Sequence, residues 1–171
     1  MREILFRGKD VISGEWVYGD LAQEKHTDNS IKCAIVQTLS TYEVTPSTVG
    51  QYTGLVDKNG KQLFNGDIVR VAEYDNMLMQ EFTEDGSRFE IFDIEEAKGG
   101  LIRSYTTAIS WEEGAFVFSS NGEYNDTFLT CLFGDMRRSY PIFEIEIVGN
   151  IYDNPDLLKG ENKDAKEALS D

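Results

Sequence analysis

The sequence predicts an all-β protein with minor α content: antiparallel strands, an inserted hairpin and one or two short helices. Three observations support this prediction. Short runs rich in β-branched and aromatic residues recur along the chain, turn-forming Gly, Asn and Asp residues separate them, and one run alternates between apolar and acidic residues. Many short strands divided by turn signals are typical of a β-barrel or β-sandwich.

Three runs near the start of the chain are predicted strands. Residues 3–7 (EILFR) and 15–21 (EWVYGDL) flank a turn-rich segment, so we expect them to pair as a hairpin with a longer loop. Residues 31–37 (IKCAIVQ) form a compact apolar run of strand length.

Two Asn-Gly pairs mark the centre of the chain. Residues 50–56 (GQYTGLV) lead into DKNG, which predicts a type I′ turn because Asn59 and Gly60 both tolerate positive φ. The NGD sequence that follows predicts a second tight turn, which starts a strand over residues 68–74 (IVRVAEY).

The second half of the chain contains three further predicted strands. Residues 101–113 precede residues 114–120 (GAFVFSS), and a Glu-Glu-Gly turn joins them. Residues 142–152 (IFEIEIVGNIY) alternate, which places Ile145 on an apolar face and Glu144 on a polar face. This pattern indicates a half-buried antiparallel strand.

Two segments lack the strand pattern and set the domain boundaries. Residues 75–100 are acidic and irregular and end in a Gly pair, so we interpret them as a variable insertion, an extended hairpin around the Asp-Gly pair at 85–86. Residues 159–171 form a polar C-terminal tail, frayed or weakly helical. The β domain is therefore expected to span residues 1–158.

One segment has the features of a short helix. In residues 125–138 (NDTFLTCLFGDMRR), Asp126 or Thr127 is suited to cap a helix N-terminus, and Gly134 is suited to end it. We therefore interpret this range as a short helix.

Length and composition fit one folded domain without a membrane span. The chain has 171 residues, of which 40% are hydrophobic and 12% aromatic, enough for a core. No apolar run approaches the roughly 20 residues that a membrane helix needs. The N-terminal residues carry charges throughout and lack the apolar core of a signal peptide. A cytoplasmic location is expected.

The chain is strongly acidic. Lys and Arg total 16 and Asp and Glu total 31, which gives a net charge of −15. Such a chain repels phosphate backbones unless its basic residues gather on one face, and here they are scattered. Nucleic-acid binding is therefore not expected. A surplus of carboxylates can attract basic proteins or imitate DNA, although a solvated surface is the simpler interpretation.

The DKNG segment does not match a calcium loop. When Gly60 is aligned with the invariant glycine of an EF-hand, Leu55 takes the first ligand position and Gly66 takes the twelfth. Neither side chain supplies an oxygen ligand. No phosphate-cradling P-loop motif is present either. A hairpin turn is the favoured interpretation.

The remaining reactive residues show no catalytic spacing. His26 is the only histidine and lies in a polar segment, so we interpret it as a solvated loop residue. Cys33 and Cys131 lie in apolar runs and are expected to be buried free thiols, with a disulfide left open. Four aspartates lie at turn or cap positions, where their side chains bond the local backbone: Asp20, Asp67, Asp126 and Asp135. We nominate no catalytic, cofactor-binding or metal-ligating residue and expect no cofactor.

Aromatic residues recur on the predicted strands. They are Trp16, Tyr18, Tyr52, Phe64, Trp111, Phe116 and Phe118. A stacking platform for single-stranded nucleic acid needs basic neighbours, and the neighbours here are mostly acidic or neutral. Core packing is the expected role.

Five segments together resemble the YopX family of phage and prophage proteins. In order they are REILFRGKD, GEWVYGDL, QYTGLVDKNGKQLFNGDIV, SWEEGAFVF and EIVGNIYDNPDLL, and they cover most of residues 2–158. The third segment and the VGNIYDNP sequence are the most specific. Residues 22–48, 75–100 and 121–141 carry little of the resemblance.

The resemblance implies an all-β fold with SH3-like barrel elements, a phage or prophage origin and assembly into higher oligomers. It brings no established enzymatic activity and no catalytic residues. In such a barrel, Gly66 and Asp67 would form the turn that starts the next strand. Gly54 and Gly149, inside predicted strands, would mark bulges or corners where the sheet closes.

Three functional hypotheses follow. The first is a phage-encoded accessory protein without enzymatic activity, which binds protein and associates with itself as a homo-oligomer; a host or phage protein is a further candidate partner. The second is an acidic DNA mimic that inhibits a host DNA-binding or restriction protein. The third is a metal-dependent hydrolase with a Mg²⁺ site of scattered carboxylates.

Overall fold

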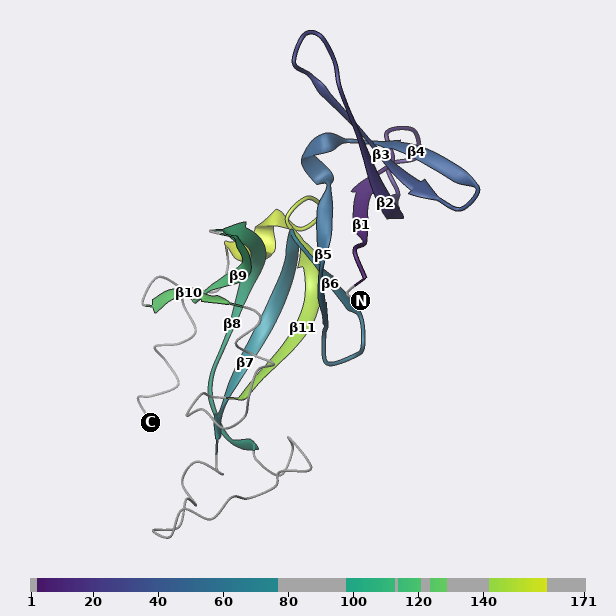
Figure 1. Ribbon diagram of the computed structural model, residues 1–171. Helices are drawn as coiled ribbons and strands as arrows, with labels where there is room; N and C mark the ends of the chain where they lie inside the picture. The colour runs from purple at the N-terminus through teal and green to yellow at the C-terminus, as the bar shows by residue number, and fades with distance from the viewer. Residues whose placement is uncertain (1–2, 77–97, 113, 121–123, 129–141, 160–171) are drawn as a thin grey trace.

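The computed structural model describes residues 3–76, 98–112, 114–120, 124–128 and 142–159, which form two antiparallel β-sheets (Figure 1). The helical content of these residues is limited to two short 3₁₀ turns, η1 (Pro46–Thr48) and η3 (Pro155–Leu158). The predicted all-β class is therefore confirmed, whereas the SH3-like barrel elements stay a prediction.

The first sheet has six strands in the order β4-β3-β2-β1-β5-β6. Their bounds are β1 Phe6–Lys9, β2 Trp16–Lys25, β3 Ile31–Gln37, β4 Ser40–Val44, β5 Gly50–Val56 and β6 Gln62–Phe64. The predicted N-terminal hairpin is confirmed, because Phe6 lies opposite Gly19 and Lys9 lies opposite Trp16. The 31–37 strand is also confirmed, whereas β4 was not predicted, since STYEV is half polar.

The outer part of the first sheet has its own small core. Cys33, Ile35 and Val44 are buried there, with Phe6 and Leu21 among the partly buried residues that pack against them. Cys33 is a free, buried thiol, as predicted. Cys131 lies outside the described residues.

The second sheet has five strands in the order β10-β9-β8-β7-β11. Their bounds are β7 Asp67–Asn76, β8 Lys98–Glu112, β9 Ala115–Ser120, β10 Tyr124–Phe128 and β11 Ile142–Asn150. Its buried residues, together with Leu63 of β6, form the larger core: Leu63, Val69, Val71, Tyr105, Ile109, Phe116, Phe118 and Ile145. The predicted alternation of β11 is confirmed, because Ile145 is buried while Glu144 forms ion pairs with Lys58 and Lys98.

Both ends of the segment predicted as an insertion, residues 75–100, lie in strands, and the insertion itself stays a prediction. β7 continues through Asn76 and β8 begins at Lys98, and these two residues lie opposite each other in the ladder. Both ends of the segment therefore extend the β7–β8 pair, because each end finds a backbone partner on the facing strand. The hairpin predicted around residues 85–86 lies outside the described residues, as do residues 160–171 of the predicted tail.

The helix predicted over residues 125–138 is wrong where the structure can test it. Asp126 and Thr127 lie in strand β10, and Thr127 is opposite Phe118 of β9. The ladder of β9 supplies backbone hydrogen-bond partners that outweigh a local capping signal. Gly134 lies outside the part of the chain that the structure describes.

The DKNG turn forms, but it is not type I′. Gly60 has a φ of 78°, while Asn59 does not adopt a positive φ. The Gly60 N–H donates to the Asp57 carbonyl at 2.9 Å, and the Asp57 N–H donates to the Lys61 carbonyl at 2.8 Å. This pattern is a type I turn closed by a glycine bulge. The Asp57 carboxylate accepts from the Asn59 and Lys61 N–H groups, so Asn59 needs no left-handed conformation.

The three glycines expected at corners behave as predicted. Gly66, with a φ of 86°, precedes β7, which begins at Asp67. The β5–β6 register shifts between Tyr52 and Val56, where Gly54 has a φ of 90°. The β7–β11 register shifts just before Gly149.

The two sheets meet where the β5–β6 hairpin lies beside β11 (Figure 1). The Lys58 N–H donates to the Ile145 carbonyl at 2.9 Å, and the Ile147 N–H donates to the Asp57 carboxylate at 3.2 Å. This hairpin therefore fixes the position of β11 relative to the first sheet.

Candidate ligand-binding cleft

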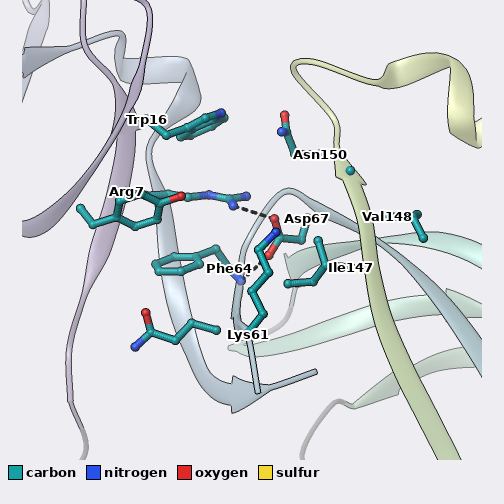
Figure 2. Close-up of a pocket in the computed structure, with 11 residues that line it drawn as sticks. Arg7, Trp16, Lys61, Phe64, Asp67, Ile147, Val148 and Asn150 are labelled. Atoms are coloured by element: carbon teal, nitrogen blue, oxygen red, sulfur yellow. Dashed lines mark hydrogen bonds and ion pairs between the residues drawn. The ribbon is translucent and has the colours of Figure 1, made fainter. Parts of the chain in front are cut away.

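A cleft of about 470 Å³ lies at the junction of the two sheets (Figure 2). Side chains from β1, β2 and β6 of the first sheet line it, together with Asp67 at the start of β7 and the last residues of β11. Its volume falls within the roughly 300–1,000 Å³ range of small-ligand sites in proteins.

Arg7 forms the centre of the cleft. Its position in β1, opposite Tyr18 on one side and Gly50 on the other, directs its side chain between two aromatic rings. The guanidinium carbon lies 4.6 Å from the ring centroid of Trp16 and 5.0 Å from that of Phe64. Stacking on aromatic faces suits the planar, weakly hydrated guanidinium group. Arg7 is only 6% exposed.

Asp67 is the counter-ion of Arg7. One carboxylate oxygen lies 2.6 Å from Arg7 Nη1, and the other accepts from the Phe64 N–H at 2.8 Å. The predicted role of Asp67 at a turn is therefore confirmed, but its ion pair was not predicted. Burial raises the pKa of Asp67, and the charge of Arg7 opposes this shift. The pair ties β1 of the first sheet to β7 of the second.

Asp153 provides a second tie between the sheets. Its carboxylate accepts from Trp16 Nε1 at 2.9 Å and from Asn150 Nδ2 at 2.9 Å, and it forms an ion pair with Lys9. The Trp16 ring also contacts Tyr152 at a centroid distance of 5.7 Å. The loop after β11 is thereby fixed to the β1–β2 hairpin.

Lys61 contributes a second positive charge, which with Arg7 opposes the rise in the pKa of Asp67. Its ammonium group extends towards Asp67 (Figure 2), yet no carboxylate of a described residue lies within ion-pair distance of it. The lining thus contains two cations, Arg7 and Lys61, and one carboxylate. A chain with a net charge of −15 therefore presents a locally positive site here.

Comparison with known proteins places the chain in a family. The family model described as "YopX protein" matches residues 5–159. The chain belongs to the YopX family. The match confirms the family that the sequence motifs predicted, and it includes every residue that lines the cleft.

Two further comparisons add to this finding. A search of curated proteins found no match. Among solved structures, the crystal structure of protein EF1440 from Enterococcus faecalis is similar, with 20% sequence identity and a TM-score of 0.44. The alignment covers 92% of this chain and 99% of that chain.

His26 of the YopX protein lies in a loop, as predicted, but it is not fully solvated. It follows β2 in a turn where its N–H donates to the Ser30 carbonyl at 2.9 Å. The residue is half-buried, and its Nε2 atom is buried without a hydrogen-bond partner among the described residues. Neither His26 nor Cys33 lines the cleft.

The aromatic residues of the YopX protein divide into two groups. Four of them are buried, as expected for core packing: Tyr52, Phe64, Phe116 and Phe118. The core prediction is wrong for Tyr18 and Trp111, which are 42% and 53% exposed, and Trp16 is half-buried at the cleft. Exposure was missed because strand position alone does not tell which face a neighbouring sheet covers.

Within the described ranges, no group of three or more His, Cys, Asp or Glu residues is arranged to hold a metal ion. The described helices of the YopX protein include none long and apolar enough to cross a membrane. Asp67 is the only described carboxylate that lines the cleft, and Arg7 and the Phe64 N–H already bind it.

The hydrogen bonds around Asp153 predict a pH-dependent stability of the YopX protein. Donation from Lys9, Asn150 and Trp16 lowers the pKa of Asp153 from 3.8 to about 2. A lowered folded-state pKa stabilises the protein above the unfolded-state value, and this stabilisation is lost as the pH falls through the folded-state value. The difference in unfolding free energy between wild type and Asp153→Asn should therefore be full above about pH 5 and shrink towards pH 2.

Urea denaturation at a series of pH values, followed by intrinsic fluorescence in dilute solution, measures this difference. A difference that stays constant across the acid range would show that the carboxylate of Asp153 does not stabilise the fold through its charge.

Proposed function

We propose that this YopX protein is a phage- or prophage-encoded accessory protein that acts by binding rather than by catalysis and associates with copies of itself. The observation that carries this proposal is the exposure of aliphatic side chains at two loop tips of the first sheet. Ile12, in the β1–β2 loop, is 92% exposed, and Leu39, in the β3–β4 turn, is 96% exposed. Exposed aliphatic side chains add nothing to the stability of an isolated chain. Covering them with a partner removes apolar surface from water, which is favourable in free energy.

The position of these tips supports a second copy as the partner. Both lie next to β4, which ends the strand order of the first sheet. Among the described residues, bridges to the free side of β4 are confined to its Glu43–Val44 end, where Val44 pairs with Asp10 and the Val11 N–H donates to the Glu43 carbonyl at 2.9 Å. An edge strand flanked by apolar tips can pair with its own copy in a two-fold symmetric arrangement.

The chemistry of the cleft supports a role without catalysis. General acid–base catalysis needs a titratable group that is accessible to a substrate. Asp67, the one carboxylate among the described lining residues, is 2% exposed and is bound by two donors. The described lining therefore offers no accessible carboxylate for acid–base catalysis, which supports recognition as its role.

Size-exclusion chromatography with light scattering tests self-association. The wild-type chain is expected to form a species larger than a monomer, and Ile12→Asp with Leu39→Asp should return it to a monomer. Leu101→Asp is the matched control, because Leu101 is 59% exposed on β8 of the second sheet. A wild-type chain that is monomeric at all salt concentrations would refute the proposal.

The alternative of an acidic DNA mimic rests on the net charge of −15. Salt distinguishes the two functions, because screening weakens attraction to a basic partner and also weakens repulsion between two acidic copies. Self-association should therefore strengthen with added salt, whereas a complex with a DNA-binding protein captured from host lysate should dissociate. Capture of a basic protein that salt releases would favour the mimic.

A further inference from the structure

We propose that the cleft between the two sheets binds an acidic peptide segment, with a carboxylate of the peptide on Lys61 and an adjacent apolar side chain against Trp16 and Tyr18. This inference goes beyond self-association and does not depend on it, because the cleft and the β4 edge are formed by different residues.

The charge of the cleft supports an anionic ligand with a single carboxylate. The other cations nearby are already paired: Arg7 with Asp67, Lys9 with Asp153, and Lys58 with Glu144 and Glu146. Lys61 alone among them forms no ion pair or side-chain hydrogen bond within the described part of the chain, and its ammonium group acts on Asp67 only at longer range. One exposed ammonium group matches one carboxylate in a charge-assisted hydrogen bond. A polyphosphate would need several free cations, and the described lining of the cleft offers only one that is not already in an ion pair.

The walls of the cleft support a peptide as the carrier of that carboxylate. Trp16 is half-buried and Tyr18 is 42% exposed, so both offer ring surface to a ligand. The Tyr18 ring is held against Phe64 at a centroid distance of 5.5 Å. Aromatic surface of this kind buries aliphatic or aromatic side chains. The Gln62 side chain lines the same cleft and can both donate to and accept from a peptide bond.

Contacts within the chain hold the shape of the cleft. The ion pair of Arg7 and Asp67 fixes its floor, and Asp153 holds the Trp16 ring in place through Nε1. A ligand therefore has few side chains to order when it binds, which favours affinity from a small contact area.

Tryptophan fluorescence provides the test. The chain has two Trp residues, so Trp111→Phe leaves Trp16 as the only fluorophore. The full chain with this change and with Ile12→Asp and Leu39→Asp, which prevent self-association from contributing to the signal, is titrated with acetyl-Leu-Phe-Glu-Leu-amide. The same peptide with Gln in place of Glu is the ligand control. The Glu peptide should give a saturable change and bind about tenfold more tightly than the Gln peptide.

A pair of lysine variants tests whether Lys61 binds the carboxylate of the peptide. Lys61→Gln should reduce the affinity for the Glu peptide to that for the Gln peptide. Lys25→Gln, the same change at an exposed lysine at the far end of β2, should leave it unchanged. Equal affinity of the two peptides, an unchanged affinity of Lys61→Gln, or tighter binding of inorganic phosphate or oligothymidine would overturn the proposal. None of these outcomes bears on the oligomeric state, which light scattering measures separately.

Discussion

Replacing Asp67 with alanine is expected to lower the free energy of unfolding by about 3–5 kcal/mol, because it leaves the Arg7 guanidinium buried without its counter-ion. Arg7 is 6% exposed, and the rings of Trp16 and Phe64 that stack on it supply no anion. The change also removes the acceptor of the buried Phe64 N–H. Urea denaturation followed by fluorescence measures the effect, which is a large part of the roughly 5–15 kcal/mol that stabilises a typical domain.

Two variants distinguish the cost of breaking the buried ion pair from the general effect of removing a charge. Arg7→Met combined with Asp67→Ala removes both charges and should recover part of the lost stability, because no buried charge is then unpaired. Lys32→Ala removes one member of an exposed ion pair with Glu43, with side chains 57% and 54% exposed, and should cost at most about 1 kcal/mol. A similar cost for Asp67→Ala and Lys32→Ala would contradict the role assigned to Asp67.

Replacing Gly50 with alanine is expected to cost about 3 kcal/mol, at the upper end of the range for overpacking a well-packed site. A Cβ atom at this position would overlap the carbonyl oxygen of Asn65, far inside van der Waals contact. That carbonyl accepts from Arg7 Nη2 at 3.3 Å, and the Asn65 N–H donates to the Gln51 carbonyl at 2.9 Å. The backbone cannot withdraw without loosening both contacts, so the substitution should also disturb the cleft.

Gly100→Ala is the matched control for this prediction. Gly100 lies in β8, is exposed, and a Cβ atom there would meet nothing within 4 Å. The same chemical change should therefore be close to neutral at Gly100, since it adds a methyl group in open space. Equal melting temperatures for the two variants would show that the close approach of Gly50 and Asn65 does not constrain the fold.

Local pattern was enough to predict most of the strands. Residues 31–37 were predicted correctly because an apolar run of this length, in a chain rich in turn signals, has few structural alternatives to a strand. The alternation around Ile145 predicted which face of β11 is buried. Glycine at 54, 66 and 149 predicted the corners, because each corner needs a conformation or a close approach that glycine permits.

The errors occurred where strand partners decide the structure. β4 has a polar sequence and forms because β3 offers a ladder, with Cys33 opposite Val44. Asp126 and Thr127 have the residue types of a helix cap, but they lie in strand β10, which pairs with β9. A single sequence window contains no information about the partner that supplies these hydrogen bonds.

The cleft was not predicted because its residues are far apart in the sequence. Arg7 and Asn150 lie in different predicted strands and Lys61 lies between two predicted turns, so only the fold brings them together. One local signal was present: Arg7 is a charged residue inside an apolar strand, next to Phe6. A buried cation requires a counter-ion, so this signal indicates a partner elsewhere in the chain without identifying Asp67.

The pairing of β11 with β7 has a consequence for how the protein is made. Ile147 lies opposite Val69, so the ladder joins segments separated by most of the second sheet. At a synthesis rate of about 5–20 residues per second, a nascent chain carries β7 for several seconds before Asn150 emerges from the ribosome. During that interval one edge of β7 has no partner, which makes the growing polypeptide a substrate for chaperones and for aggregation until translation reaches β11.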